Sequence, residues 1–299
     1  MSDATTGSHT TVEIDCLFAD GGAAMVELCE RFGGYGMYSQ ERVDSPIGVG
    51  LAQRHDALSN FLRTGGRTGN AGQEDVATLG ARTNYFREEY AYGLQPMIDG
   101  IEPFLHHPAL VEAAQAIFPD RPVIEPAIAF ANVMVPGQEL AVHTDVPEFR
   151  GCNRKVMPQW LLVAMHHSGL FEQHRLPIAT GVSWFHDCDG GEFTCWPDGA
   201  DGSARQHPVR QNTAVVLDAD SVFHGVDRIA PALPTTLGAS AISALVLDPR
   251  IRKAHAVVFA RKVAISRPGG YFLRRPVGSA GAVGPPAVPL LQGNAGTRA

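Results

Sequence analysis

The chain after Pro122 divides into short apolar segments, and this division constrains the fold more than any other feature of the sequence. Clusters of Gly, Pro or Asp separate most of the segments, as turns separate strands. Eight such segments at modest spacing predict antiparallel strands in a sandwich or barrel. The predicted strands are Val123 to Val135, Gln159 to Met165, Ala179 to Phe185, Gly191 to Trp196, Thr213 to Leu217, Val222 to Ile229, Ala239 to Leu247 and Ala256 to Ala264.

The first part of the chain indicates helices instead. Asp20 is a candidate cap for a helix over residues 23–32, which Gly33 and Gly34 would end. Apolar residues recur at helical spacing over two further ranges, Asn84 to Phe104 and Pro108 to Phe118. A short helix is also expected from Asp56 through Leu62. The candidate lids are the segments Ser39 to Gly50 and Gly65 to Gly80.

These patterns predict three parts. Residues 1–121 form a mainly helical region that buttresses the core, and residues 122–275 form the β core. Residues 276–299 are rich in Gly, Ala and Pro and lack periodicity, which is typical of a flexible tail.

Composition narrows the class of partner. The chain has 299 residues, a net charge of −7 and no run of Lys or Arg, which argues against nucleic acid or an anionic membrane as the partner. We therefore expect a small-molecule substrate. The five cysteines include no Cys-x-x-Cys pair, and no apolar stretch reaches the roughly 18 residues of a membrane span. A cytoplasmic protein is expected, and the oligomeric state is not readable from the sequence.

The triplet His143-Thr144-Asp145 carries the chemistry. Residues two apart on a strand point to one face, so His143 and Asp145 can reach one metal ion, and His224 on a later strand can supply a third ligand. Two imidazoles and one carboxylate on one side of the ion leave coordination positions open for substrate oxygens and dioxygen, as in ferrous oxygenases. A chain with 12 His also produces His-x-Asp by chance, so the surrounding sequence decides.

Several motifs in that surrounding sequence occur in a fixed order. They are His107-Pro108-Ala109-Leu110, Val135-Pro136-Gly137 before the triplet, Gly190-Gly191-Glu192-Phe193 after Trp184-Phe185, and Leu217-Asp218 before Phe223-His224-Gly225-Val226. Over roughly Pro108 to Leu247 the chain thus resembles the iron(II)/2-oxoglutarate-dependent dioxygenases, especially the prolyl 4-hydroxylase-like branch. The resemblance implies an α+β fold with a double-stranded β-helix core, of the jelly-roll or cupin-like kind, with N-terminal helices packed against it.

The resemblance also implies a site and a reaction. His143, Asp145 and His224 would hold Fe(II), with 2-oxoglutarate as cosubstrate and O2 as oxidant. The reaction would oxidise a C–H bond of a small metabolite, usually by hydroxylation, and would release succinate. An Asp at position 145 argues against halogenation, because halogenating relatives have a small residue there.

One family feature is missing. Relatives place an Arg on the strand after the distal His to bind the far carboxylate of 2-oxoglutarate, but the segment Leu237 to Leu247 has no basic residue. Arg228 is the first substitute, because it lies four residues after His224 and faces the same side of a strand. Arg154 and Lys155 are the alternatives. Arg228 is equally well interpreted as a surface residue paired with an acid.

Other conspicuous residues have simpler explanations. His166 and His167 are adjacent and would point to opposite faces of a strand, so we expect a structural role and no zinc site. The cluster from His186 to Asp189 is expected to be the loop before Gly190. Four aromatic residues are expected in the core: Trp184, Phe185, Phe149 and Trp160.

Two other functions remain open at this stage. The missing Arg is consistent with a mononuclear iron oxygenase that does not use 2-oxoglutarate. A double-stranded β-helix is also consistent with a non-catalytic, cupin-like metal-binding protein, because function belongs to the site and not to the fold.

Overall fold

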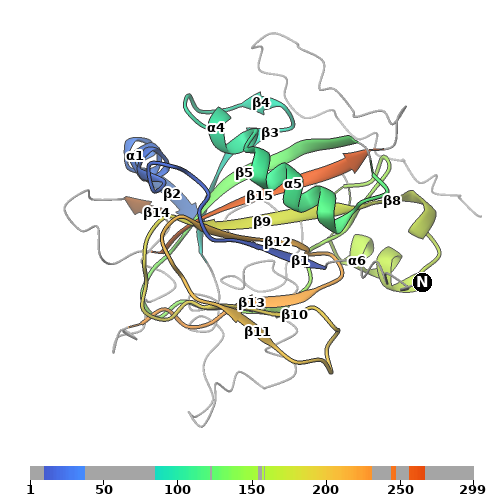
Figure 1. The fold of residues 1–299 in the computed structure, drawn as a ribbon. Coiled ribbons are helices and arrows are strands. Elements are labelled where there is room, and N and C mark those ends of the chain that lie inside the picture. The colour runs from blue at the N-terminus through green and yellow to red at the C-terminus, as the bar shows by residue number, and fades with distance from the viewer. Residues whose placement is uncertain are drawn as a thin grey trace, which may run out of the picture.

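The computed structural model describes residues 10–37, 85–121, 123–153, 157, 159–230, 244–246 and 256–266. Two antiparallel sheets face each other in this part of the chain (Figure 1). The larger sheet has the strand order β1-β12-β9-β15-β5-β3-β2-β14, with β4 paired to β3, and the smaller has the order β11-β10-β13-β6. The predicted lids, the helix expected from Asp56 and the tail lie outside the described residues.

The strand bounds are as follows. The large sheet contains β1 (Thr11–Ile14), β2 (Gly34–Met37), β3 (Phe86–Tyr92), β4 (Gln95–Pro96), β5 (Val123–Met134), β9 (Ile178–Trp184), β12 (Thr213–Asp218), β14 (Ala244–Val246) and β15 (Ala256–Ser266). The small sheet contains β6 (Leu140–His143), β10 (Phe193–Trp196), β11 (Arg205–His207) and β13 (Phe223–Val226). A separate pair joins β7 (Glu148–Phe149) to β8 (Arg175–Leu176).

The order in which the chain visits the two sheets identifies the fold. From β5 onward it crosses to β6 in the small sheet, returns to β9, crosses to β10 and β11, returns to β12, crosses to β13 and returns to β15. Strands that alternate between two facing antiparallel sheets in this way form a double-stranded β-helix. The predicted fold class is therefore confirmed.

Alternation along β5 explains how the two faces of the large sheet differ. Ala129, Ala131 and Val133 belong to the main apolar cluster on the outer face, whereas Ile128 and Phe130 form a separate cluster on the inner face. A strand buried on both faces has few polar residues, and this strand is apolar along most of its length.

Helices cover the outer face of the large sheet (Figure 1). They are α1 (Ala23–Phe32), α4 (Glu102–Leu105) and α5 (Pro108–Ile117), which lies against β1, β12 and β9. The carboxylate of Asp20 accepts hydrogen bonds from the N–H groups of Gly22 and Ala24, and Gly33 ends α1 with a φ of 78°. The helices predicted over residues 23–32 and 108–118 are confirmed.

Two predictions of local structure were wrong. The range Asn84 to Phe104 was predicted as helix but contains β3 and β4, so the N-terminal region supplies strands to the large sheet as well as helices. Gln159 to Met165 was predicted as a strand but belongs to the helix α6 (Gln159–Ser168). The strand predicted over Ala239 to Leu247 is present in its described residues as β14, which pairs with β2 at the end of the large sheet, outside the alternating core.

The remaining helical piece is the short 3-10 helix η2 (Glu172–His174), which connects α6 to β8. Within the described residues, no helix combines the length and hydropathy that a membrane span requires. All five cysteines are free thiols.

Candidate metal centre

The two predicted histidine ligands lie directly opposite each other on neighbouring strands of the small sheet. His143 is the last residue of β6, and the register pairs it with His224 on β13. Paired residues of an antiparallel ladder have side chains on the same face, so both imidazoles project together. Asp145 follows β6 by two residues, and its backbone N–H donates to the carbonyl of Ala219 over 2.7 Å.

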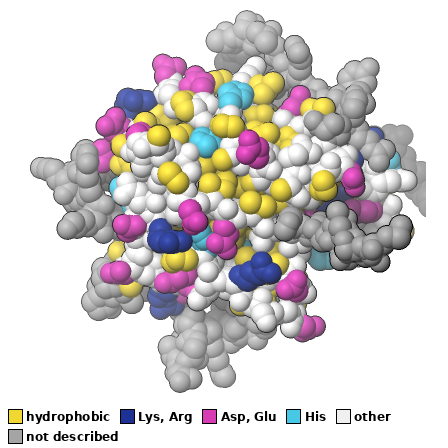
Figure 2. All heavy atoms as spheres, in the orientation of Figure 1, with side chains coloured by type: hydrophobic (Ala, Val, Ile, Leu, Met, Phe, Trp, Pro, Cys, Tyr) yellow, Lys and Arg dark blue, Asp and Glu magenta, His cyan; other side chains and the backbone are white. Residues whose placement is uncertain are grey.

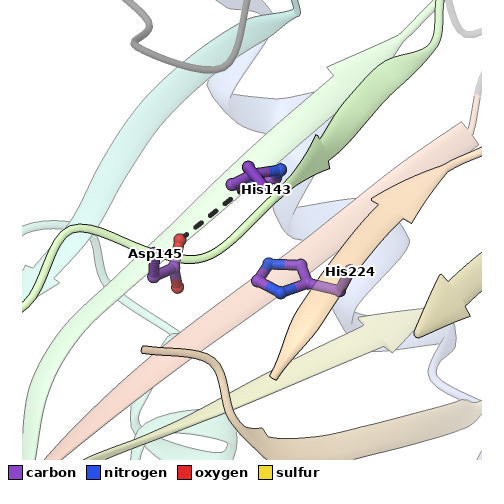
Figure 3. A group of neighbouring side chains, drawn as sticks. All are labelled: His143, Asp145 and His224. Carbon is purple, nitrogen blue, oxygen red and sulfur yellow. Dashed lines mark ion pairs between the residues drawn. The ribbon is translucent and has the colours of Figure 1, made fainter. Parts of the chain in front are cut away.

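The three side chains converge (Figure 3). One potential ligand atom from each of His143, Asp145 and His224 lies within 4.8 Å of the others. His143 Nε2 is 4.0 Å from Asp145 Oδ1, and the two imidazole ring centroids are 4.5 Å apart. Within the described chain, this is the group of three or more His, Cys, Asp or Glu side chains close enough to share a metal ion.

Backbone carbonyls fix which nitrogen of each imidazole carries the proton. His143 Nδ1 lies 2.7 Å from the carbonyl oxygen of Ala141, and His224 Nδ1 lies 2.8 Å from that of Val222. A carbonyl only accepts, so each Nδ1 is the donor and each neutral ring has its lone pair on Nε2. Metal-binding histidines commonly have this arrangement, which orients the ring and raises its basicity.

The carboxylate is oriented by a second contact. Thr180 on β9 donates from its hydroxyl to Asp145 Oδ2 over 3.3 Å, while Oδ1 is the oxygen nearer His143. Thr180 of the large sheet thus orients the carboxylate of Asp145, which lies in the connection that follows β6 of the small sheet.

One turn contacts two of the three residues, Asp145 through its backbone and His224 through its side chain. The turn from Asp218 to Val222 connects β12 to β13, and its carbonyls at Ala219 and Val222 accept from Asp145 and His224 respectively. Its Asp220 is 1% exposed and lies 3.9 Å from a guanidinium nitrogen of Arg175 on β8.

Burial governs the protonation of the groups around that turn. Desolvation raises the pKa of Asp218, although a hydrogen bond from Ser221 and the charge of Arg175 oppose the shift. Desolvation also lowers the pKa of His166, as does the positive charge of Arg175.

Two neighbours of His224 fix its position. A Cβ on Gly225 would lie 2.9 Å from the carbonyl oxygen of Leu140, so only glycine lets β13 approach β6 this closely. On the other side Phe193 stacks on the His224 ring, with centroids 5.7 Å apart and planes at 29°. His224 itself is 6% exposed.

Arg228, the first residue predicted to bind the cosubstrate, pairs with an acid near the surface. Arg228 is 40% exposed, and its Nε donates to Glu139 Oε2 over 3.0 Å. This is the surface ion pair that the sequence allowed as the alternative. Arg154 and Lys155 lie outside the described residues. A role for any of the three in binding 2-oxoglutarate stays a prediction.

The double glycine has the conformation that its sequence motif requires. Gly190 and Gly191 have φ values of 71° and 74°, and a Cβ on Gly190 would lie 2.4 Å from the carbonyl oxygen of Arg228. The cluster from His186 to Asp189 forms the loop before them, as predicted. His166 and His167 occupy the last turn of α6.

The aromatic residues expected in the core are buried where their side chains are described. Trp184, Phe185 and Phe149 are at most 2% exposed. The side chain of Trp160 is outside the described part.

Sequence reasoning missed Thr180, Ala219 and Gly225. A Thr on an apolar strand and a carbonyl in a turn have no local signature, because each acts on a residue far away in the chain. Gly225 did have a signal, since it stands beside His224 in the Phe-His-Gly-Val motif. Glycine within a strand often marks close backbone approach.

No protein-family model matches the chain, and no curated protein matches it by sequence. Solved structures do resemble it. A prolyl-4-hydroxylase from Pseudomonas putida is 13% identical, with a TM-score of 0.43, and the match covers 87% of this chain and 94% of that one. A 2OG-Fe(II) oxygenase family oxidoreductase from Burkholderia pseudomallei is 13% identical, with a TM-score of 0.36 and coverage of 84% and 93%.

A third similar structure is the viral collagen prolyl hydroxylase of Paramecium Bursaria Chlorella virus-1 in complex with 2OG. It is 9% identical, with a TM-score of 0.40, and the match covers 88% of this chain and 99% of that one. These identities and TM-scores are too low to assign an activity. The alternation of strands between the two sheets identifies the fold.

Proposed function

We propose that the protein is an iron(II)/2-oxoglutarate-dependent oxygenase with His143, Asp145 and His224 as its metal ligands. The convergence of two imidazoles and one carboxylate, with one potential ligand atom of each within 4.8 Å of the others, carries the proposal. Two imidazoles and one carboxylate suit ferrous iron and leave coordination positions for other molecules. When bound, the iron would activate O2 with electrons from the oxoacid and the substrate.

The protein's own residues contribute orientation and a protected environment. Ala141, Val222 and Thr180 hold the outer atoms of the three ligands, so little reorganisation accompanies metal binding. Phe193 covers one side of His224 and keeps water from that imidazole.

A small molecule is the proposed substrate class, and oxidation of one of its C–H bonds is the proposed reaction. The net charge of −7 supports this class over a polyanion. Among the described side chains on the face shown in Figure 2, Lys and Arg lie scattered among acidic ones and form no broad basic patch.

The test is anaerobic loading with Fe(II) followed by addition of 2-oxoglutarate, ascorbate and O2. We expect one bound iron per chain and release of succinate and CO2. Bound iron without any affinity for 2-oxoglutarate, together with O2 consumption on some substrate, would favour an oxygenase independent of the oxoacid. Bound metal with no O2 consumption on any substrate pool would favour a cupin-like binding protein.

A further inference from the structure

The backbone around Arg175 holds the segment that follows Asp145. Arg175 lies on β8, where the register pairs it with Phe149 of β7. Next to this pair, the backbone N–H of Arg150 donates to the carbonyl of His174 over 2.9 Å. β7 begins three residues after Asp145, so β8 fixes the path of the chain as it leaves the metal centre.

The side chain of Arg175 extends to the turn between β12 and β13. Its Nη1 lies 3.9 Å from Oδ2 of Asp220, whose side chain is buried, and the Arg175 side chain is itself 14% exposed. In the same turn the Ala219 carbonyl accepts from the N–H of Asp145, and a second carbonyl accepts from His224 Nδ1. Asp220 follows Ala219 directly, so the ion pair lies beside a carbonyl that contacts a predicted ligand.

The turn needs a nearby positive charge. Asp218 and Asp220 place two carboxylates close together in the turn, away from most of the water. Burial raises the pKa of Asp218, and the charge of Arg175 opposes the shift. Removing one partner of a buried ion pair leaves the other charge uncompensated in a low dielectric. Without Arg175, the turn would have to move so that water could reach its carboxylates.

A second contact of the same guanidinium is exposed. Arg175 Nε donates to Glu172 Oε1 over 2.7 Å, and the Glu172 side chain is 56% exposed. Exposed ion pairs contribute little to stability, because water and salt screen them. Loss of Glu172 therefore removes a partner of Arg175 but leaves the buried pair in place.

We infer that Arg175 and Asp220 are positioning residues of the metal centre. Their ion pair fixes the turn between β12 and β13, and the carbonyls of that turn orient Asp145 and His224. The inference rests on the proposed function, because it takes these two residues as metal ligands. The pair acts through the backbone, so neither residue needs to touch the metal ion.

The experiment measures anaerobic binding of Fe(II) and of Co(II) to the full chain. Bound Co(II) also has a visible absorption spectrum that depends on the geometry of its ligands. Two variants break the buried pair, Arg175→Gln and Asp220→Asn. Arg175→Lys keeps the positive charge, and Glu172→Gln is the matched control that alters the exposed partner alone.

We expect Arg175→Gln and Asp220→Asn each to weaken Fe(II) binding roughly tenfold and to change the Co(II) spectrum. The shared direction separates positioning from a long-range effect of charge. By charge alone, loss of a cation would strengthen Fe(II) binding and loss of an anion would weaken it. Glu172→Gln should match the wild type in both affinity and spectrum.

The conservative and double variants complete the test. Arg175→Lys should retain most of the affinity, because a contact of 3.9 Å depends on charge and is too long for a hydrogen bond. The double variant Arg175→Gln/Asp220→Asn leaves neither charge of the pair and serves if a single variant does not fold. It should weaken Fe(II) binding by roughly the tenfold of one single variant, because the two residues act as a pair.

Three results would overturn the inference while the proposed function survives. Fe(II) affinity that rises in Arg175→Gln and falls in Asp220→Asn would mean that the two residues act by charge alone. A loss of roughly 100-fold in the double variant would mean that they act independently. Wild-type affinity and spectrum in every variant would mean that the pair only stabilises the fold. A wild type that binds neither Fe(II) nor Co(II) would instead remove the ligand assignment, and the inference with it.

Discussion

The molecule has two buried clusters of polar side chains, one on the outer face of the large sheet and one between the two sheets. They satisfy their hydrogen bonds in opposite ways. On the outer face, the hydroxyl groups of Tyr35 and Tyr90 hydrogen-bond to each other, and Tyr35 donates to the carbonyl of Cys29. Inside, His143 and His224 use their Nδ1 atoms on backbone carbonyls and direct their remaining polar atoms toward Asp145.

The difference separates a structural polar cluster from a binding site. In the outer cluster every partner belongs to the protein, and burial raises the pKa of Cys29 and of both tyrosines so that they stay neutral. In the metal centre, groups of the protein hydrogen-bond to one polar atom of each of the three side chains. One potential ligand atom of each side chain lies within 4.8 Å of the others. The geometry of such a site depends on these supporting hydrogen bonds. Each of them can be tested by a single substitution.

Removing a ligand should give the largest effect. Asp145→Ala deletes one of three donors, and we expect Fe(II) affinity to fall by more than about 100-fold, above the usual effect of a supporting residue. Thermal stability of the metal-free protein should change little. Anaerobic titration followed by iron analysis measures the first quantity, and calorimetry measures the second.

Asp227→Ala is the matched control for Asp145→Ala. Asp227 accepts hydrogen bonds from Thr194 and Gln206, away from the triad, so its loss should leave iron binding intact. Equal iron content in Asp145→Ala and the wild type would show that the ligand assignment is wrong.

Separating the two ligand strands should come next. Gly225→Ala places a Cβ 2.9 Å from the Leu140 carbonyl oxygen, so β13 must move away from β6 and carry His224 with it. We expect Fe(II) affinity to drop roughly 10- to 100-fold and the free energy of unfolding to fall by about 1–3 kcal/mol. Gly34→Ala is the control, because a Cβ there meets nothing within 4 Å. Equal metal affinities for the two variants would contradict the close-approach argument.

Loosening the carboxylate should have a smaller effect. Thr180→Val keeps the shape of the side chain but removes the donor to Asp145 Oδ2, and we expect Fe(II) affinity to fall about tenfold. The chain supplies a matched pair, because Thr194 donates to Asp227 in the same manner outside the centre. Thr194→Val should not alter the Fe(II) Kd measured by anaerobic titration. A Thr180→Val variant with wild-type affinity would mean that the carboxylate needs no support.

The sequence could predict features that depend on local patterns, but not contacts between residues that are distant in the chain. The convergence of His143, Asp145 and His224 was predictable, because His143 and Asp145 are two residues apart and the motif around His224 is local. The spacing of short apolar segments predicted antiparallel strands in a sandwich or barrel, and the resemblance to the dioxygenases implied the double-stranded β-helix. Thr180 and Ala219 were not predictable, because each contacts Asp145, a residue that only the crossing between the two sheets brings near.

The errors in local structure also have physical causes. The range from Asn84 was misinterpreted because β3 is buried on both faces and its pairing with β5 is irregular between Glu89 and Ala91. Phe86 and Tyr90 are both buried and lie four residues apart, a spacing that fits one face of a helix as well as one face of a strand. In α6 an unbroken apolar run has no usable period, but its Leu, Ala and Met residues favour a helix over a strand.

The outer cluster yields the smallest predicted effect, and it appears at alkaline pH. Burial raises the pKa of Cys29 from 9.0 to about 12, so the folded thiol stays neutral at a pH where the unfolded thiol ionises. Stability from this group is complete below pH 9 and is lost progressively as the pH rises toward 12. Between pH 9 and 10 the loss of stability should be about 1 kcal/mol.

Denaturant unfolding of the wild type and of Cys29→Ala over this pH range isolates the contribution of Cys29, because the other titrating groups are common to both proteins. The variant should be less stable at pH 8 but lose less on the way to pH 10, since it has no thiol to ionise. If the free energies of unfolding of the two proteins fall equally with pH, Cys29 ionises as readily in the folded protein as in the unfolded chain. The outer cluster would then not keep its buried groups neutral, and its contrast with the metal centre would fail.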